Sequence, residues 1–378
     1  MTRILITGGA GFIGSRLATA LNADGHTVTM LDNLLPQVHG VDSCNSELLG
    51  VARAAGDVVV GDITDRQLLQ QTLAGQEVVI HLAAETGTGQ SMYEIERYSR
   101  VNVGGTALLL DILANDRSRS VTKVVVASSR SIYGEGRYFS EELGYVYPET
   151  RDELDLLAGR FEPTVPGDKS GLKLVGTSED SQIHPSSVYG ITKHTQESLI
   201  MTVGPTLGIA TVALRYQNVY GPGQSLSNPY TGILSIFSTL IRQGKGINVF
   251  EDGLESRDFV YIDDVVRATA QAALDPRADG QVFNVGSGVG TTVNTVVEEL
   301  MRAYGRTVPV EITGNFRLGD IRHNVADLTR VREVLGFEPK VDFRTGVEAF
   351  AQWVQDQELT EGGYEASLQE MREKNLLK

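Results

Sequence analysis

The chain has 378 residues, of which 41% are hydrophobic and 21% charged, a balance typical of a globular protein with a substantial core. Its formal net charge of −15 argues against nonspecific binding to nucleic acid or to a membrane surface. The single cysteine, Cys44, excludes an intramolecular disulfide and a multi-cysteine metal site, so we expect no metal and a reduced, cytoplasmic location. No apolar run is long enough to span a membrane.

The first half of the chain alternates short apolar runs with segments of helical periodicity. Helical spacing is found in GSRLATALNADG (14–25) and VGGTALLLDILANDR (103–117). The apolar runs are RILIT (3–7), TVTML (27–31), DVVVG (57–61), EVVIHL (77–82) and KVVVASS (123–129). Near-continuous apolar runs are typical of strands buried on both faces. The alternation therefore predicts an α/β fold with a doubly wound parallel sheet of the Rossmann type.

The pattern changes twice along the chain. Residues 1–217 are predicted to form the Rossmann-type domain, interrupted at about 134–186 by a stretch rich in Gly, Pro and acids, which we interpret as an insertion over the ligand-binding edge of the sheet. Residues 218–355 are predicted to form a smaller mixed α/β lobe, and a strand and helix near 257–274 are expected to return to the first domain. Residues 356–378 are predicted to be a solvated helical tail.

The segment TGGAGFIG follows the first strand and opens the first helix. Gly8, Gly11 and Gly14 would allow a tight turn and close approach of a pyrophosphate to backbone amides at the helix N-terminus. Asp32 ends the second strand, where a carboxylate accepts the ribose hydroxyls of NAD and repels the 2′-phosphate of NADP. The only basic side chain in the following NLLPQVHG is His39, so NAD is the predicted cofactor.

Further cofactor contacts are predicted from strand ends and helix starts. Asp62 ends the third strand and could meet the adenine, although an ordinary turn acid explains it almost as well. Asn102 opens the segment before VGGT and is equally well explained as a helix N-cap. The full predicted set consists of the three glycines and Asp32 with Phe12, Ile13, Asn33, Asp62, Ile63, Leu82, Ala83, Ala84, Asn102, Tyr189 and Lys193.

Three side chains could carry the chemistry beside this cofactor. Ser129 closes the fifth strand, at the sheet edge where open α/β sheets bind ligands. Tyr189 and Lys193, in YGITK, stand four residues apart and would share one helix face. A nearby ammonium favours the phenolate, so we expect Tyr189, whose ordinary pKa is about 10, to act as the base. Ser129 would hydrogen-bond the same substrate oxygen.

Eight motifs together resemble those of the extended short-chain dehydrogenase/reductases that act on nucleotide sugars. They are TGGAGFIG, HLAA, VNVGGT, SSRSIYGEG, YGITK, LRYQNVYGPGQ, RDFVYIDDV and FNVGSG, in this order. The resemblance implies a permanently bound NAD, the catalytic set Ser129, Tyr189 and Lys193, a nucleoside-diphosphate sugar as substrate, and a homodimer paired through the helix after VNVGGT and the YGITK helix.

Within this family the residues favour redox-neutral epimerisation. In the 4,6-dehydratases a Thr-Asp-Glu sequence supplies acid and base, whereas Ser129 is followed here by Arg130 and Ser131. A 4-ketoreductase or dehydrogenase is the alternative, disfavoured by Asp32 if NADPH is the reductant, and a non-catalytic NAD-binding regulator is a further one. The segments SSRSIYGEGRY, GRFEP and GPGQSLSNPYTGILSIF resemble those of dTDP-L-rhamnose 4-epimerases, although cysteines associated with that branch after GRFEP are replaced by TVPGDKS.

The resemblance also implies substrate contacts. Arg257 and Arg322 match diphosphate-binding positions, although acids flank both and surface ion pairs are the alternative. Asn218 matches a residue whose amide meets the diphosphate. Glu85, Thr86 and Arg130 are placed by position alone where the hexose should lie, and His81 is expected to be a packed core residue.

Overall fold

The protein is described by a computed structural model that covers residues 1–226, 228, 232–358 and 363–378. The remaining residues, 227, 229–231 and 359–362, belong to the motif at 221–237 and to the predicted tail, and lie outside the described residues. None of the helices in the described part of the chain is long and apolar enough to cross a membrane.

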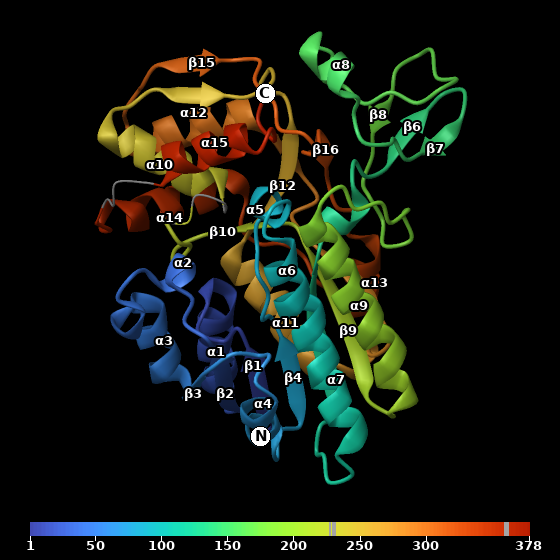
Figure 1. The fold of residues 1–378 in the computed structure, drawn as a ribbon, viewed down its shortest axis with the longest axis vertical. Helices are drawn as coiled ribbons and strands as arrows, with labels where there is room; N and C mark the ends of the chain where they lie inside the picture. The colour runs from blue at the N-terminus through green and yellow to red at the C-terminus, as the bar shows by residue number, and fades with distance from the viewer. Residues whose placement is uncertain (227, 229–231, 359–362) are drawn as a thin grey trace.

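A seven-stranded parallel sheet forms the centre of the first domain (Figure 1), as the sequence predicted. Its strand order is β13-β9-β5-β4-β1-β2-β3. The strands are β1 (Arg3–Thr7), β2 (Thr27–Asp32), β3 (Asp57–Val60), β4 (Val78–His81), β5 (Lys123–Ser129), β9 (Ala210–Tyr216) and β13 (Val282–Val285). The register pairs Thr7 with His81 and Ser129 with Tyr216, so the carboxyl ends of these strands meet along one edge.

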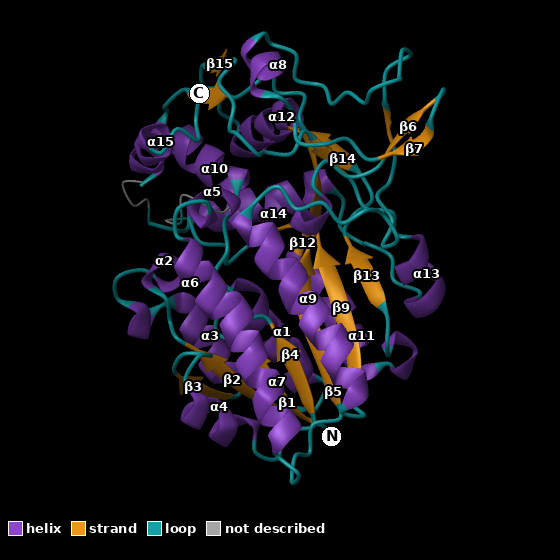
Figure 2. Cartoon of the chain, turned by 45° about the vertical axis from the view of Figure 1, so that its right-hand side comes forward, coloured by secondary structure: helices purple, strands orange, loops and turns teal. Residues whose placement is uncertain are grey.

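Helices cover both faces of the sheet because its strands are apolar on both sides. On β1, Ile4 and Ile6 join one buried cluster and Leu5 joins the other. The first face carries α1 (Phe12–Ala23), α3 (Glu47–Ala55) and α11 (Ile262–Leu274). The second carries α4 (Arg66–Leu73), α7 (Gly105–Asn115) and α9 (Val188–Thr206), of which α7 and α9 cross in front of the strands in Figure 2.

The helix before α7 begins earlier than the sequence indicated. Helix α6 (Ile95–Tyr98) continues through a π-helical turn, Ser99–Gly104, directly into α7. Asn102 lies in that turn, with helical backbone before and after it. The N-cap interpretation of Asn102 is therefore wrong, since no helix starts there.

The C-terminal lobe combines a four-stranded sheet, a strand pair and helices. The sheet consists of β10 (Asn218–Tyr220), β12 (Ser256–Tyr261), β14 (Gly290–Thr292) and β16 (His323–Asn324), and the pair of β11 (Ile247–Val249) and β15 (Val310–Ile312). Its larger helices are α10 (Ile233–Gln243), α12 (Val293–Tyr304) and α14 (Phe343–Gln355).

The remaining helices pack with the first domain. Helix α13 (Thr329–Leu335) contacts β13 of the main sheet. The short helices of this domain are α2 (Pro36–His39), η1 (Ser43–Asn45), α5 (Thr88–Ser91), η3 (Arg130–Tyr133) and η4 (Pro276–Ala278).

The chain returns to the first domain by a different strand from the one predicted. Helix α11 does pack against α1 and the main sheet. Strand β12, however, pairs with β10, β14 and β16 and stays in the lobe. The returning strand is β13, which extends the main sheet beside β9 because its apolar residues complete both cores.

The insertion and the tail both have structure of their own. The insertion contains β6 (Tyr138–Ser140), β7 (Gly144–Val146), β8 (Lys173–Leu174) and α8 (Glu153–Leu157), and it projects at the upper right of Figure 1. The tail forms α15 (Tyr364–Glu373), which buries Leu368 and Met371 together with Leu377. The prediction of a solvated tail is wrong, because these apolar residues recur on one side and pack against Phe250 of the lobe.

Candidate active site

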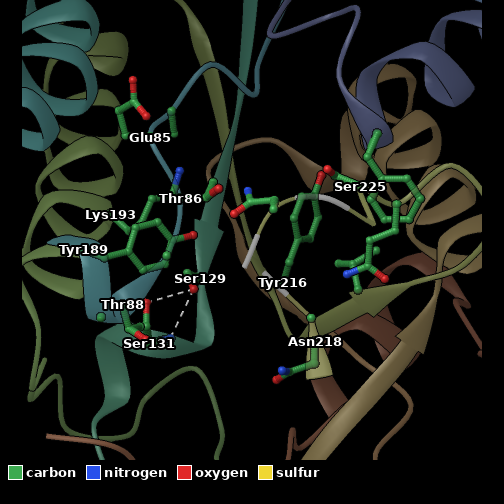
Figure 3. Close-up of a pocket in the computed structure, with 18 of the residues that line it drawn as sticks. Glu85, Thr86, Thr88, Ser129, Ser131, Tyr189, Lys193, Tyr216, Asn218 and Ser225 are labelled. Carbon is green, nitrogen blue, oxygen red and sulfur yellow. Dashed lines mark hydrogen bonds between the residues drawn. The ribbon is translucent and has the colours of Figure 1, made fainter. Parts of the chain in front are cut away.

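A cavity of about 620 Å³ extends along the carboxyl ends of the strands into the C-terminal lobe. Figure 3 shows Ser129, Tyr189 and Lys193 on its domain side, facing Tyr216 and Asn218. The predicted site residues that line it are Gly8, Gly11, Phe12, Ile13, Gly14, Asp32, Asn33, Ile63, Leu82, Ala83, Ala84, Glu85, Thr86, Ser129, Arg130, Tyr189, Lys193, Asn218 and Arg257. Asp62, Asn102 and Arg322 do not line it.

The glycine turn has the form that a dinucleotide pyrophosphate requires. Gly8 adopts φ +69°, and a Cβ there would lie 2.9 Å from the backbone nitrogen of Ala83. A Cβ at Gly14 would lie 2.4 Å from the carbonyl oxygen of Gly8. Helix α1 starts after Gly11 without a side-chain cap, so its first amides face the cavity and can bind an anion.

Asp32 is held at the edge of the cavity by backbone amides. Its Oδ2 accepts from the amide of Ala10 over 3.0 Å, and its Oδ1 from the amide of Leu34 over 2.9 Å. His39, the one basic side chain that the sequence offered nearby, has Nε2 3.7 Å from Oδ1. This fixed carboxylate beside the glycine turn fits the ribose of NAD.

Asp62 and Asn102 do not line the cavity, but each forms a hydrogen bond with a residue that does. Asp62 accepts a hydrogen bond from Nδ2 of Asn33 over 3.1 Å, and it is Asn33 that lines the cavity. Asn102 is fully buried; its Oδ1 accepts from the amide of Glu85 over 2.7 Å, and its Nδ2 donates to Oγ1 of Thr192 over 2.9 Å. These bonds tie the loop after β4 to α9, so both residues have positions suited to orienting others.

Tyr189 lies beside Ser129 in the cavity wall (Figure 3), and Arg130 lines the same cavity. Burial raises the pKa of Tyr189, while a hydrogen bond with Ser129 and the charge of Arg130 act in the opposite direction. Arg130 keeps its charge at neutral pH although burial lowers its pKa to about 10. The sequence interpretation assigned the lowering of the tyrosine pKa to Lys193, and it placed Arg130 at the hexose without an effect on Tyr189.

Lys193 lines the cavity and also belongs to a buried polar network. Its Nζ donates to Oε1 of Gln196 over 2.7 Å, and Nε2 of Gln196 donates to Oγ1 of Thr106 over 2.8 Å. Burial lowers the pKa of Lys193 to about 7, and the carboxylate of Glu197 partly opposes this. Burial thus works against the cationic form that the sequence interpretation assumed.

His81 is the packed core residue that was expected. Its Nδ1 lies 2.7 Å from Oγ1 of Thr7 and its Nε2 2.9 Å from Oγ1 of Thr106. Burial, followed by the charge of Lys193, lowers the pKa of His81 to about 3. The neutral ring therefore holds the ends of β1, β4 and α7 together.

The structure separates the two predicted diphosphate arginines. Arg257 lines the cavity and is only partly neutralised, through Nη2 and Oδ1 of Asp320 over 3.0 Å. The side chain of Arg322 is fully buried away from the cavity wall, between acids. Its partners are Glu162 and Asp252 at 2.7 Å, Glu251 at 2.9 Å and Glu255 at 3.7 Å. Arg322 is therefore corrected from a substrate contact to a structural cation, because these carboxylates already surround its guanidinium.

Arg317 occupies the place that the sequence gave to Arg322. It lines the cavity, its guanidinium carbon lies 5.0 Å from the centre of the Phe250 ring, and its Nε has no hydrogen-bond partner among the described residues. The Oδ1 of Asn218 is likewise unpartnered within the described chain. Arg317 was visible in the sequence as a second candidate for binding the diphosphate. Only the acids around Arg322, which the fold brings together, show that Arg317 and not Arg322 reaches the cavity.

The insertion contributes little to this site. Within the predicted insertion, 134–186, all of it described, Ser186 is the one residue that lines the cavity. Arg151 anchors the insertion to the lobe instead, with Nη1 2.9 Å from Oε2 of Glu251. The expectation that the insertion covers the site is wrong, because this buried ion pair holds it beside the site.

Across the described residues there is no group of three or more His, Cys, Asp or Glu side chains that could hold a metal ion.

Comparison with known proteins identifies the family. Residues 4–151 and 164–286 match the NAD dependent epimerase/dehydratase family. The chain belongs to this family. A dTDP-L-rhamnose 4-epimerase from Burkholderia thailandensis is 38% identical over 356 residues, covering 93% of this chain and 94% of that protein. A UDP-glucose 4-epimerase from Mycolicibacterium smegmatis is 33% identical over 350 residues, covering 91% and 96%.

A solved structure agrees with the fold and the cofactor. The UDP-glucuronic acid 4-epimerase from Bacillus cereus, in complex with UDP-glucuronic acid and NAD, matches with a TM-score of 0.76 at 25% identity. The match covers 93% of this chain and 99% of that chain. The predicted enzyme class and cofactor are confirmed: the epimerase described here is an NAD-dependent enzyme of nucleotide sugars.

Proposed function

We propose that the enzyme inverts the hydroxyl at C4 of a dTDP-6-deoxyhexose such as dTDP-L-rhamnose. The relative that is 38% identical over 93% of the chain supports this substrate. Ser129 is followed by Arg130 and Ser131, which lack the carboxyl groups that elimination of water would need. The observation that carries the proposal is one continuous cavity lined by the glycine turn, by Tyr189 with Ser129, and by the arginines of the lobe.

In this proposal Tyr189 removes the proton from the sugar hydroxyl and later returns it. NAD, when bound, supplies the hydride acceptor and donor. Ser129 hydrogen-bonds the same sugar oxygen, and Arg130 favours the phenolate by its charge. Lys193, whose Nζ donates to Gln196, would hold the ribose of the cofactor. When its ammonium is protonated, Lys193 would also stabilise the phenolate of Tyr189.

We also propose that Arg257 and Arg317 bind the diphosphate and Asn218 contacts it. Both arginines line the cavity of a protein whose net charge is −15, so local cations must offset an unfavourable mean field. Glu85, Thr86 and Arg130 remain the proposed contacts of the hexose, since all three line the cavity near Tyr189.

The test is incubation of the purified enzyme with dTDP-L-rhamnose, UDP-glucose and UDP-glucuronic acid, followed by NMR of the sugar. Conversion of dTDP-L-rhamnose to its C4 epimer, faster than either UDP-sugar reacts, is the expected result. Faster conversion of a UDP-sugar would overturn the substrate assignment. Net oxidation or reduction of NAD at 340 nm during turnover would instead favour a reductase or dehydrogenase.

We further propose a homodimer paired through α7 and α9. These helices pack on one another over the outer face of the sheet, and Ile191 on α9 is 51% exposed. An exposed apolar side chain on such a face is consistent with a partner surface. Sedimentation equilibrium of the enzyme and of Ile191→Glu tests this: the expected dimer should weaken in the variant, and a monomeric wild type would contradict it.

A further inference from the structure

The C-terminal segment, residues 363–378, forms part of the cavity wall. Tyr364 and Met371 on α15, and Leu376 after it, line the cavity. Met371 is 4% exposed and packs with Leu368, Leu377 and Phe250 of the lobe. The family match ends at residue 286, so this segment lies outside it.

The segment is fixed to the lobe by backbone hydrogen bonds. The amide of Leu318 donates to the carbonyl oxygen of Leu376 over 3.0 Å. Phe316 and Lys378 exchange two further bonds of 3.0 Å. These bonds set Leu376 directly beside the segment that carries Arg317.

The same segment also contacts the NAD-binding domain. The hydroxyl of Tyr93 donates to Oε2 of Glu370 over 3.0 Å. A Cβ at Gly89 would lie 3.4 Å from the sulfur of Met371. Helix α15 lies near α5, the helix that contains Gly89, in both Figure 1 and Figure 2. Residues 363–378 thus bridge the lobe and the domain across one side of the cavity.

The lining at this side combines apolar surface with a cation. Phe250, Met371 and Leu376 provide the apolar surface, and Arg317 stacks its guanidinium on Phe250. A nucleoside diphosphate has the matching chemistry, because its base is flat and apolar on its faces and its phosphates are anionic. The glycine turn and Tyr189 occupy other parts of the wall. We therefore expect the nucleoside end of the substrate to contact Phe250, Met371 and Leu376.

We infer that residues 363–378 complete the nucleoside subsite, with Met371 and Leu376 in contact with the nucleoside diphosphate part of the substrate. The inference rests on the proposed function for its ligand class. It makes the C-terminal segment a determinant of substrate affinity, located far in sequence from the catalytic residues.

Two neighbouring leucines provide a matched test. Leu376 lines the cavity, whereas Leu377 is buried in the cluster with Leu368 and is not part of the wall. Isothermal titration of dTDP and of UDP into the NAD-loaded enzyme measures Kd for the wild type, Met371→Ala, Leu376→Ala and Leu377→Ala. Met371→Ala and Leu376→Ala should raise Kd, and KM for the nucleotide sugar, roughly three- to tenfold while kcat changes less than about twofold.

Leu377→Ala should lower the melting temperature and leave Kd within about twofold of the wild type. Unchanged Kd values for both cavity variants would overturn the inference, as would an equal rise in Leu377→Ala. If the wild type binds dTDP or UDP but does not convert dTDP-L-rhamnose, the substrate assignment fails and the Kd values still decide the inference. If it binds neither nucleoside diphosphate, both proposals fail.

Discussion

Nη1 of Arg322 donates a hydrogen bond to Oε2 of Glu251 over 2.9 Å at the junction between the insertion and the substrate lobe. Arg151 of the insertion binds both oxygens of the same carboxylate, each over 2.9 Å. Glu251 adopts φ +49°, a backbone conformation that costs energy for a residue with a side chain. The ion pairs with the two arginines can offset this cost, and they give Arg322 a structural role.

Substitution of Arg322 should therefore affect stability more than substrate binding. Arg322→Leu removes one of the two arginines that pair with the buried carboxylate of Glu251. It should therefore lower the free energy of unfolding by about 3–5 kcal/mol. Arg317→Leu should cost about 1 kcal/mol or less and raise KM about tenfold or more. Denaturant unfolding and initial-rate kinetics of the two variants check this. A folded Arg322→Leu enzyme with the larger rise in KM would contradict it.

Tyr189→Phe should remove the proton-transfer group and keep the fold. We expect kcat to fall by about 10²–10⁴-fold, because general acid–base catalysis contributes on this order. Bound NAD, measured by absorbance after denaturation, should remain at the wild-type level. Tyr145→Phe is the control, since the Tyr145 ring is 63% exposed on the insertion. Full activity in Tyr189→Phe would refute the assigned role.

The charge of Arg130 should be visible in the pH dependence of activity. Arg130 lowers the pKa of Tyr189, so Arg130→Met should raise it. Activity needs the deprotonated phenol, and the acidic limb of kcat/KM should therefore move to higher pH in Arg130→Met. Arg130→Lys keeps the charge and should show a smaller displacement. Coincident acidic limbs in the wild type and Arg130→Met would exclude this effect.

Glu255 should make the protein less stable as the pH rises. Burial raises the pKa of Glu255 from its ordinary 4.5 to about 7, so between these values the folded protein binds a proton that the unfolded chain has released. Stability consequently falls from about pH 4.5 to about pH 7. Glu255→Gln cannot ionise and should stabilise by about 1–3 kcal/mol at pH 8 and by little at pH 4.5.

Denaturant unfolding of Glu255→Gln at both pH values, without substrate, gives the difference. Glu298→Gln, which alters an exposed glutamate on α12, is the control and should change stability at neither pH. An equal gain at both pH values would indicate that packing, and not ionisation, is responsible.

Local patterns were sufficient for the main sheet and for most of the cofactor site. The apolar runs of β1 to β5 encode burial on both faces, and TGGAGFIG with Asp32 encodes the glycine turn and the carboxylate beside it within 32 residues. These features depend on neighbours in the sequence, so reading the chain in order was enough. The returning strand was misplaced because β12 and β13 both contain a short apolar run, and only their pairing partners distinguish them.

The sequence by itself determined the family fold and the NAD fingerprint, and it predicted Ser129, Tyr189 and Lys193 as one set, which the structure places along the same cavity. Only the tertiary structure decided that Arg317 reaches the cavity while Arg322 does not, that the charge of Arg130 acts on Tyr189, and that the tail lines the site. The physical reason is that charge compensation and burial depend on residues that are distant in the sequence and are brought together only by the fold. The carboxylates around Arg322 come from residues 162, 251, 252 and 255, and the surface that buries Met371 includes Phe250.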